Sequence, residues 1–245
     1  MADRRPAPAA RARAAAQTSS ASADRRRAGV LLPAYRRGAA RSIQLLLRDR
    51  VSIRFLDRDK TYRFARLHHA TPCSLPSTGK SPHALRYLTG QMRARTRLPR
   101  GLFALRTLTG QGRRLFVDRH PGRGRGLANR DAVLGLLRGL GFEAFDPELT
   151  SVRQQVVRFS AAEIVVGIAG AGMTNTVFCR PGTPVIHLVP EGWEDRFYGE
   201  IATACGQDYA AVFGPRIASD APEYLRDFAI DPEPLREALA ASGLR

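Results

Sequence analysis

The chain has 245 residues, of which 44% are hydrophobic, and a formal net charge of +17 that comes almost entirely from arginine. That length allows one large domain or two small ones, and the hydrophobic content is enough for a packed core. No apolar run reaches the roughly 18 residues that a membrane-spanning helix needs. The Arg- and Ala-rich start lacks the apolar stretch of a secretion signal, and a transit peptide is the less favoured alternative. We expect a cytoplasmic protein.

The positive charge is concentrated in two stretches, Arg4 to Arg41 and Arg93 to Arg125. They lack the interleaved aromatic residues of a single-strand-binding surface, so specific nucleic-acid recognition is not expected. Weak attraction to the inner face of a membrane, or to other polyanions, is expected instead. The three cysteines, Cys73, Cys179 and Cys205, form no metal-type pair, which favours a reducing compartment. The five histidines show no zinc spacing.

The first third of the chain divides into a tail and a small folded part. Residues 1–28 are rich in Arg, Ala, Ser and Pro and are predicted to be a disordered basic tail. Residues 29–80 are predicted to form a partial N-terminal domain. Its expected elements are a strand at Val30–Leu32, a helix at Tyr35–Leu47, a strand at Val51–Leu56 and a partner strand at Thr61–Leu67.

The triplet Asp57-Arg58-Asp59 lies between the last two of these strands. Such a D-x-D triplet can bind a metal ion. Its place between two strand-like runs favours a charged turn.

Residues 81–245 are predicted to form a larger α/β domain. It begins with a helix for which Ser81 is the cap and Pro82 the first residue. Further strands are expected at Leu115–Val117, Phe142–Phe145, Ala162–Ile168 and Pro184–Val189. Helices are expected at Asp131–Leu140, Gln154–Ala161, Glu200–Cys205 and Pro234–Ser242, with Gly141 as a stop signal. This alternation is typical of a parallel, doubly wound sheet.

The most informative segment is the small-residue turn that follows the strand at Ala162–Ile168. An apolar strand that enters a Gly-rich turn and a helix start presents backbone N–H groups to phosphate in many α/β proteins. Gly170 and Gly172 allow close approach of a ligand, and Thr174 and Asn175 can cap the helix or donate to an anion. The alternative is that the glycines serve only tight packing.

The wider segment resembles the C-terminal core of glycosyltransferase family sixty-one. Residues 159–188, FSAAEIVVGIAGAGMTNTVFCRPGTPVIHL, are similar to the family's signature around "V-G-x-H-G-A-G". Further matches in order are Leu115–Arg119, Arg125–Asn129, Gln155–Phe159, Phe197-Tyr198 and Cys205–Tyr209. The resemblance covers roughly Val30 to Leu239 and is sharp from Leu115 to Tyr209. Two positions depart from it: the family's histidine is Ala169 here, and a family glutamate is His187.

The resemblance implies a GT-B-like fold, with a Rossmann-type nucleotide-sugar-binding domain and a shortened acceptor-side domain before it. It implies an inverting, metal-independent enzyme without a cofactor, a UDP-sugar donor, and a polysaccharide or protein acceptor such as a capsular polysaccharide. A non-catalytic remnant that keeps the fold is one alternative. An NAD-binding oxidoreductase is another, although the order G-x-G-x-x-G is absent.

Arg119 and Arg125 follow a strand, and could grip a diphosphate opposite the Gly-rich turn. Asn129 could cap the next helix, Trp193 could stack on a base or simply pack, and Glu191 could replace the missing glutamate. No catalytic base can be nominated. The predicted substrate-binding residues are Arg119, Arg125, Asn129, Gly170, Ala171, Gly172, Thr174, Asn175, His187 and Glu191.

Overall fold

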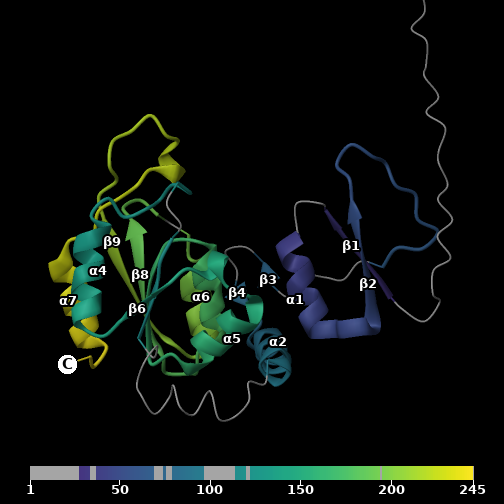
Figure 1. Cartoon of the computed structure of the whole chain (residues 1–245), viewed down its shortest axis with the longest axis horizontal. Helices are drawn as coiled ribbons and strands as arrows, with labels where there is room; N and C mark the ends of the chain where they lie inside the picture. The colour runs from purple at the N-terminus through teal and green to yellow at the C-terminus, as the bar shows by residue number, and fades with distance from the viewer. Residues whose placement is uncertain are drawn as a thin grey trace, which may run out of the picture.

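The structure of the chain is a computed structural model (Figure 1). It describes residues 28–33, 37–68, 74–75, 79–96, 114–119, 122–193 and 195–244. The predicted tail lies outside these residues except for Ala28, which begins the first strand. Cys73 also lies outside the described residues.

A five-stranded parallel sheet forms the centre of the larger domain. Its strands are β5 (Arg114–Val117), β6 (Glu143–Phe145), β7 (Ile164–Ile168), β8 (Pro184–Pro190) and β9 (Asp208–Gly214). They lie in the order β6-β5-β7-β8-β9, and every neighbouring pair is parallel. The predicted parallel sheet is therefore confirmed, and the first four strands are the predicted ones. β9 was not predicted.

Helices cover both faces of this sheet. They are α4 (Arg130–Gly139), α5 (Val152–Ala161), α6 (Phe197–Cys205) and α7 (Pro232–Ala241), with the 3-10 helices η3 (Pro147–Leu149), η4 (Ala171–Phe178) and η5 (Glu223–Leu225). α4 and α7 pack on one face, and α5, η4 and α6 on the other (Figure 1). β7 supplies both cores because its residues alternate, with Val166 facing α4 and α7 and Val165 facing α5. The domain is thus a three-layer sandwich.

The strand order creates one place where ligands collect in folds of this kind. The chain leaves β5 in one direction to form β6, and then crosses back over β5 to form β7. The loops after β5 and β7 therefore diverge and leave a crevice at the carboxyl edge of the sheet. Ligands of doubly wound sheets bind at such a reversal point. Here the reversal brings Arg119 and the Gly170–Gly172 turn to the same edge.

The first part of the chain forms a smaller α/β unit. β1 (Ala28–Pro33) pairs in parallel with β2 (Val51–Leu56), with α1 (Arg37–Leu47) and the 3-10 helix η2 (Arg48–Arg50) between them. The prediction of a strand at Thr61–Leu67 is wrong, because residues 61–67 form no regular element; β2 pairs instead with β1, which precedes it in the chain. Asp57 instead pairs with Lys60 at 2.7 Å in a charged turn, as predicted.

Short elements join the two parts. β3 (Ser74–Leu75) and β4 (Gly79–Lys80) form an antiparallel pair, and α2 (Pro82–Arg95) follows. The hydroxyl of Ser81 accepts a hydrogen bond from Ala84 N at 3.3 Å, which confirms the predicted cap. Among the described residues, no helix is both long and apolar enough to cross a membrane.

Gly167 fixes the distance between β7 and η4. A Cβ atom there would lie 2.1 Å from Met173 Sδ and 2.9 Å from Val117 Cβ. We expect Gly167→Ala to lower the free energy of unfolding by roughly 1–3 kcal/mol, because overpacking must displace the branched Val117. Urea denaturation would measure the change.

Gly135 provides the matched control, because it is exposed in the middle of α4 and a Cβ atom there would meet nothing within 4 Å. Gly135→Ala should raise the free energy of unfolding by roughly 0.5–1 kcal/mol. Equal stability of the two variants would contradict this account of Gly167.

Candidate active site

Arg119 lies at the centre of the carboxyl edge of the sheet and joins two loops. Its Nε donates to Gly124 O at 2.6 Å and its Nη2 to Arg123 O at 3.2 Å, both in the loop after β5. Its Nη1 donates to Ala169 O at 3.3 Å, at the end of β7. Burial lowers the pKa of Arg119 from its usual value, and the nearby cation Arg125 lowers it further. The guanidinium is thus held in a positive environment.

The two glycines of the turn make room for protein groups. A Cβ atom at Gly170 would lie 2.2 Å from Arg119 Nη1, so this glycine admits the arginine. At Gly172 it would lie 3.1 Å from Pro147 Cγ and 3.2 Å from Val117 Cγ1. The prediction that Gly172 leaves space for a ligand is therefore wrong, because its free side faces the protein. The packing alternative holds there, and only Ala171, at the tip, is exposed.

The segment after the turn is a 3-10 helix without a side-chain cap. Asn175 does not cap it, since its Nδ2 donates to Gly172 O at 3.1 Å within the helix. Thr174 is hydrogen-bonded to the Tyr198 hydroxyl. Tyr198 in turn donates to Gly170 O at 2.6 Å. Thr174 and Asn175 thus stabilise the turn through hydrogen bonds instead of capping the helix. Tyr198 of α6 adds a further hydrogen bond to the turn.

Arg125 reaches the same edge from the loop after β5. Its backbone has a φ of +57°, and its amide donates to Leu225 O at 2.8 Å, which fixes the direction of the side chain. The guanidinium carbon lies 4.8 Å from the centre of the Trp193 ring, a cation–π contact. Among the described residues, neither Arg125 Nε nor Trp193 Nε1 has a hydrogen-bond partner, although both are buried.

His187 lies in β8 beneath these groups and is almost completely buried. Its Nδ1 is 3.0 Å from the Tyr209 hydroxyl, and its ring packs edge-on against Tyr198 with centres 4.6 Å apart. Burial, together with the Arg125 charge, lowers the pKa of His187 to about 4. The ring is therefore neutral at physiological pH, and its buried Nε2 has no partner within the described part of the chain.

A second group of charges lies on the other side of Arg119. Asp118 accepts hydrogen bonds from Nε and Nη2 of Arg130 and from the backbone N–H of Arg119. This pair borders a cavity of about 390 Å³, which residues from the Gly122–Gly126 loop and from 217–227 also line. Asp118 therefore neutralises the guanidinium of Arg130, whereas it contacts Arg119 only through the backbone N–H.

Two predicted site residues serve other roles. Asn129 does not cap α4: its amide donates to Ile230 O at 2.7 Å and its carbonyl accepts from Ile230 N at 3.1 Å. It ties the C-terminal segment to the domain. The Glu191 side chain is exposed, and the contacts of that residue are made by its backbone, with Gly214 and Arg216.

The structure adds Tyr198, Tyr209 and Arg130 to the site. Both tyrosines lie in segments that match the family motifs, yet nothing in their spacing shows that they enclose His187. Arg130 directly follows Asn129, and no motif or spacing in the sequence marks it as a site residue.

Chemically, the edge presents two arginines, a Trp N–H and a neutral histidine, while the Asp118 carboxylate is bonded to Arg130 and the Arg119 amide. Such a group of donors suits a multiply charged anion. No group of three or more His, Cys, Asp or Glu that could hold a metal ion occurs within the described ranges.

The sequence profile described as Glycosyltransferase 61 matches residues 28–186, more than half of the chain. The chain belongs to this family. It is 31% identical over 117 residues to a xylan glycosyltransferase of Arabidopsis thaliana, a match that covers 45% of this chain and 24% of that protein. It is also 31% identical over 132 residues to an alpha-1,3-arabinosyltransferase of Oryza sativa subsp. japonica, covering 50% of this chain and 22% of that protein. The chain thus spans about a quarter of the length of these relatives.

The buried, neutral His187 gives a pH prediction. Its folded pKa of about 4 lies below the unfolded value of 6.5, so the unfolded state binds more protons between these values. Its contribution to stability is present above pH 6.5 and is lost as the pH falls toward 4. Relative to His187→Gln, the wild type should lose roughly 2–3 kcal/mol of unfolding free energy between pH 7.5 and 4.5.

Urea unfolding of both proteins at the two pH values measures this difference, since other titrating groups cancel. The same pH dependence in the variant and the wild type would show that the pKa of His187 is the same in the folded and the unfolded protein.

Proposed function

We propose that this chain carries the nucleotide-sugar site of a glycosyltransferase, and that the donor is a UDP-sugar. The donor diphosphate would lie between Arg119, Arg125 and the Gly170–Gly172 turn, at the reversal point of the sheet. Membership of the glycosyltransferase 61 family supports a transferase, and the local chemistry supports a diphosphate.

The observation that carries the proposal is a set of three buried nitrogen atoms without partners in the described structure: Arg125 Nε, His187 Nε2 and Trp193 Nε1. A fourth such nitrogen, Arg95 Nε, belongs to α2. Buried donors normally have a hydrogen-bond partner. When the Tyr209 hydroxyl donates to Nδ1 of His187, the neutral ring carries its hydrogen on Nε2. All three nitrogens then donate, which suits phosphate oxygens.

The arrangement also suits the chemistry of sugar transfer. As the glycosidic bond to the nucleotide breaks, the leaving diphosphate gains negative charge, which preorganised donors and cations stabilise. Arg119 is held by three carbonyl groups and Arg125 by Trp193, so neither needs to reorganise during the reaction. We propose that these arginines supply the charge that a metal ion supplies elsewhere, and that the transfer is inverting and metal-independent.

We further propose a GT-B-like arrangement, in which the β1–α1–β2 unit belongs to a second, N-terminal domain. The name of the xylan glycosyltransferase favours a polysaccharide acceptor over a protein one. A capsular or other surface polysaccharide, made at the cytoplasmic face of the membrane, remains the proposed product.

A second candidate is a protein that binds the nucleotide but transfers nothing. The observation that favours it is Ala169, which stands where the family has a histidine and is completely buried against Leu188. Release of UDP from UDP-sugars in the presence of acceptor separates the two candidates. Both would bind UDP, but only the first would consume the UDP-sugar and release UDP.

Arg125→Ala should weaken UDP binding about ten- to a hundredfold, because a charge-assisted contact is worth roughly 1.5–3 kcal/mol. Calorimetry with UDP measures the affinity. Arg123→Ala is the matched control: Arg123 lies in the same loop, but is exposed and paired with Glu148 at 2.8 Å. It should change the affinity by less than about threefold.

A wild type that fails to bind UDP would refute the donor proposal. Equal loss of affinity in the two variants would point to general attraction by the basic loop rather than to a site at Arg125.

A further inference from the structure

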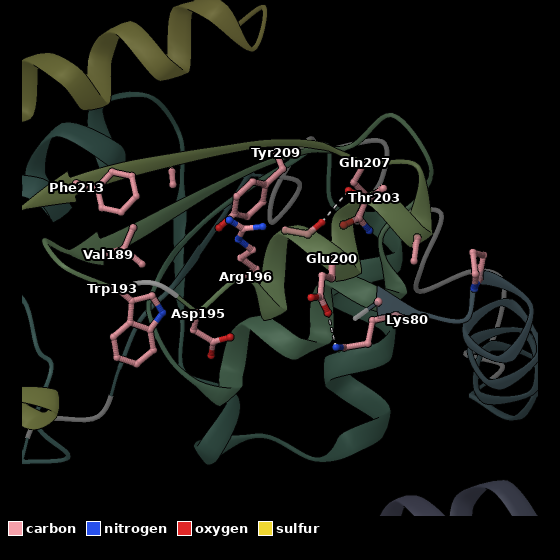
Figure 2. A pocket seen from close by; sticks show the side chains of 15 residues that line it. Lys80, Val189, Trp193, Asp195, Arg196, Glu200, Thr203, Gln207, Tyr209 and Phe213 are labelled. Carbon is pink, nitrogen blue, oxygen red and sulfur yellow. Dashed lines mark hydrogen bonds and ion pairs between the residues drawn. The ribbon is translucent and has the colours of Figure 1, made fainter. Parts of the chain in front are cut away.

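An open groove of about 1190 Å³ runs between β9 and α6, on the α6 face of the sheet (Figure 2). Trp193, Val189 and Phe213 lie toward one end of it, and Lys80, Thr203 and Gln207 toward the other. One end of the groove lies at Trp193, whose ring also contacts the Arg125 guanidinium. From there the groove leads away from the carboxyl edge of the sheet. The groove and the proposed donor site therefore share Trp193.

One wall of the groove is an aromatic surface on the edge strand. Tyr209, Ala211 and Phe213 point to the same side of β9 because strand residues alternate. Phe213 is 53% exposed and Tyr209 38% exposed. At about 3.3 Å per residue, the two rings mark a platform roughly 13 Å long. Gly199 of α6 faces the Tyr209 ring without a side chain, which keeps the groove open at its middle.

The opposite wall is polar but carries little net charge. Lys80 is bonded to Glu200 at 2.6 Å, and both side chains are largely buried, so their charges cancel (Figure 2). Asp195 and Arg196 add one charge of each sign. Gln207 is 92% buried; its Nε2 donates to Thr176 O, while its Oε1 has no partner among the described residues.

These features select among possible occupants. Flat aromatic rings bind the C–H faces of sugar rings, and uncharged amide and hydroxyl groups bind sugar hydroxyls. The balanced charge disfavours an acidic polymer, because Lys80 is already paired. A platform of this length holds two to three sugar units of a chain that starts beside Trp193.

We propose that this groove binds the acceptor as an extended neutral glycan, with Phe213 and Tyr209 as its stacking platform. The inference rests on the proposed sugar transfer, and it assigns the acceptor to a class: a neutral oligo- or polysaccharide held over several units. The reacting end of the glycan lies at Trp193, next to the donor diphosphate, and the rest follows β9.

The test is calorimetry of the full chain with neutral hexasaccharides (xylo-, cello-, manno- and laminarihexaose), with hexagalacturonic acid as the charged counterpart and UDP as a separate ligand. At least one neutral hexasaccharide should bind and its monosaccharide should not. Phe213→Ala should weaken that binding about three- to tenfold and leave UDP affinity unchanged. Tyr87→Ala is the matched control, because Tyr87 is 72% exposed and lies outside the groove.

The outcomes separate this inference from the donor proposal. UDP binding without binding of any neutral hexasaccharide overturns the glycan groove and leaves the donor site standing. Glycan binding without UDP binding overturns the donor site and leaves the glycan groove standing. Equal binding of hexagalacturonic acid, or equal effects of Phe213→Ala and Tyr87→Ala, also overturns the groove. So does sedimentation that shows a wild-type dimer which Phe213→Ala converts to a monomer, because a second copy would then cover the platform.

Discussion

The site depends above all on the guanidinium of Arg119, which ties the loop after β5 to the end of β7. One side chain donates to Gly124, Arg123 and Ala169, and so it joins the two loops that border the crevice at the strand reversal. The glycine at position 170 fits this contact, since a Cβ atom there would lie 2.2 Å from Arg119 Nη1. The direction of Arg125 follows as well, because the same loop carries it toward Trp193.

Burial then sets the chemistry of the groups around Arg119. His187, Tyr198 and Tyr209 form a packed cluster below the turn, so the histidine stays neutral, and its Nε2 is buried without a partner among the described residues. A carboxylate at this position would neutralise one of the arginines. A neutral imidazole keeps the site positive, which suits an anionic ligand better than a sugar hydroxyl.

The sheet could be predicted because its inner strands are short apolar runs between clear turns, as at Leu115–Val117 and Pro184–Val189. β9 escaped prediction because Ala210 and Ala211 at its centre lack the branched or aromatic side chains that mark strands. The partner of β2 was misassigned because alternation along Val51–Leu56 does not say whether the neighbour comes before or after it. The parallel pairing of β2 with β1 joins residues far apart in the sequence, so no local pattern shows it.

The sequence indicates which of the predicted site residues lie together, but not which contacts each of them makes. Arg119, Arg125, Gly170 and His187 do meet at one edge, as motif order and strand ends indicated. The roles of Asn129 and Gly172 depend on contacts with Ile230 and Pro147, which no local pattern shows.

A crystal structure of the chain with UDP would test the central claim most directly. The account predicts the two phosphates between Arg119 and Arg125, against the Gly170–Gly172 turn, with Trp193 and His187 within hydrogen-bond distance. Phosphates bound in the groove between β9 and α6, or on the exposed basic surface with the Arg119 crevice unchanged, would contradict it.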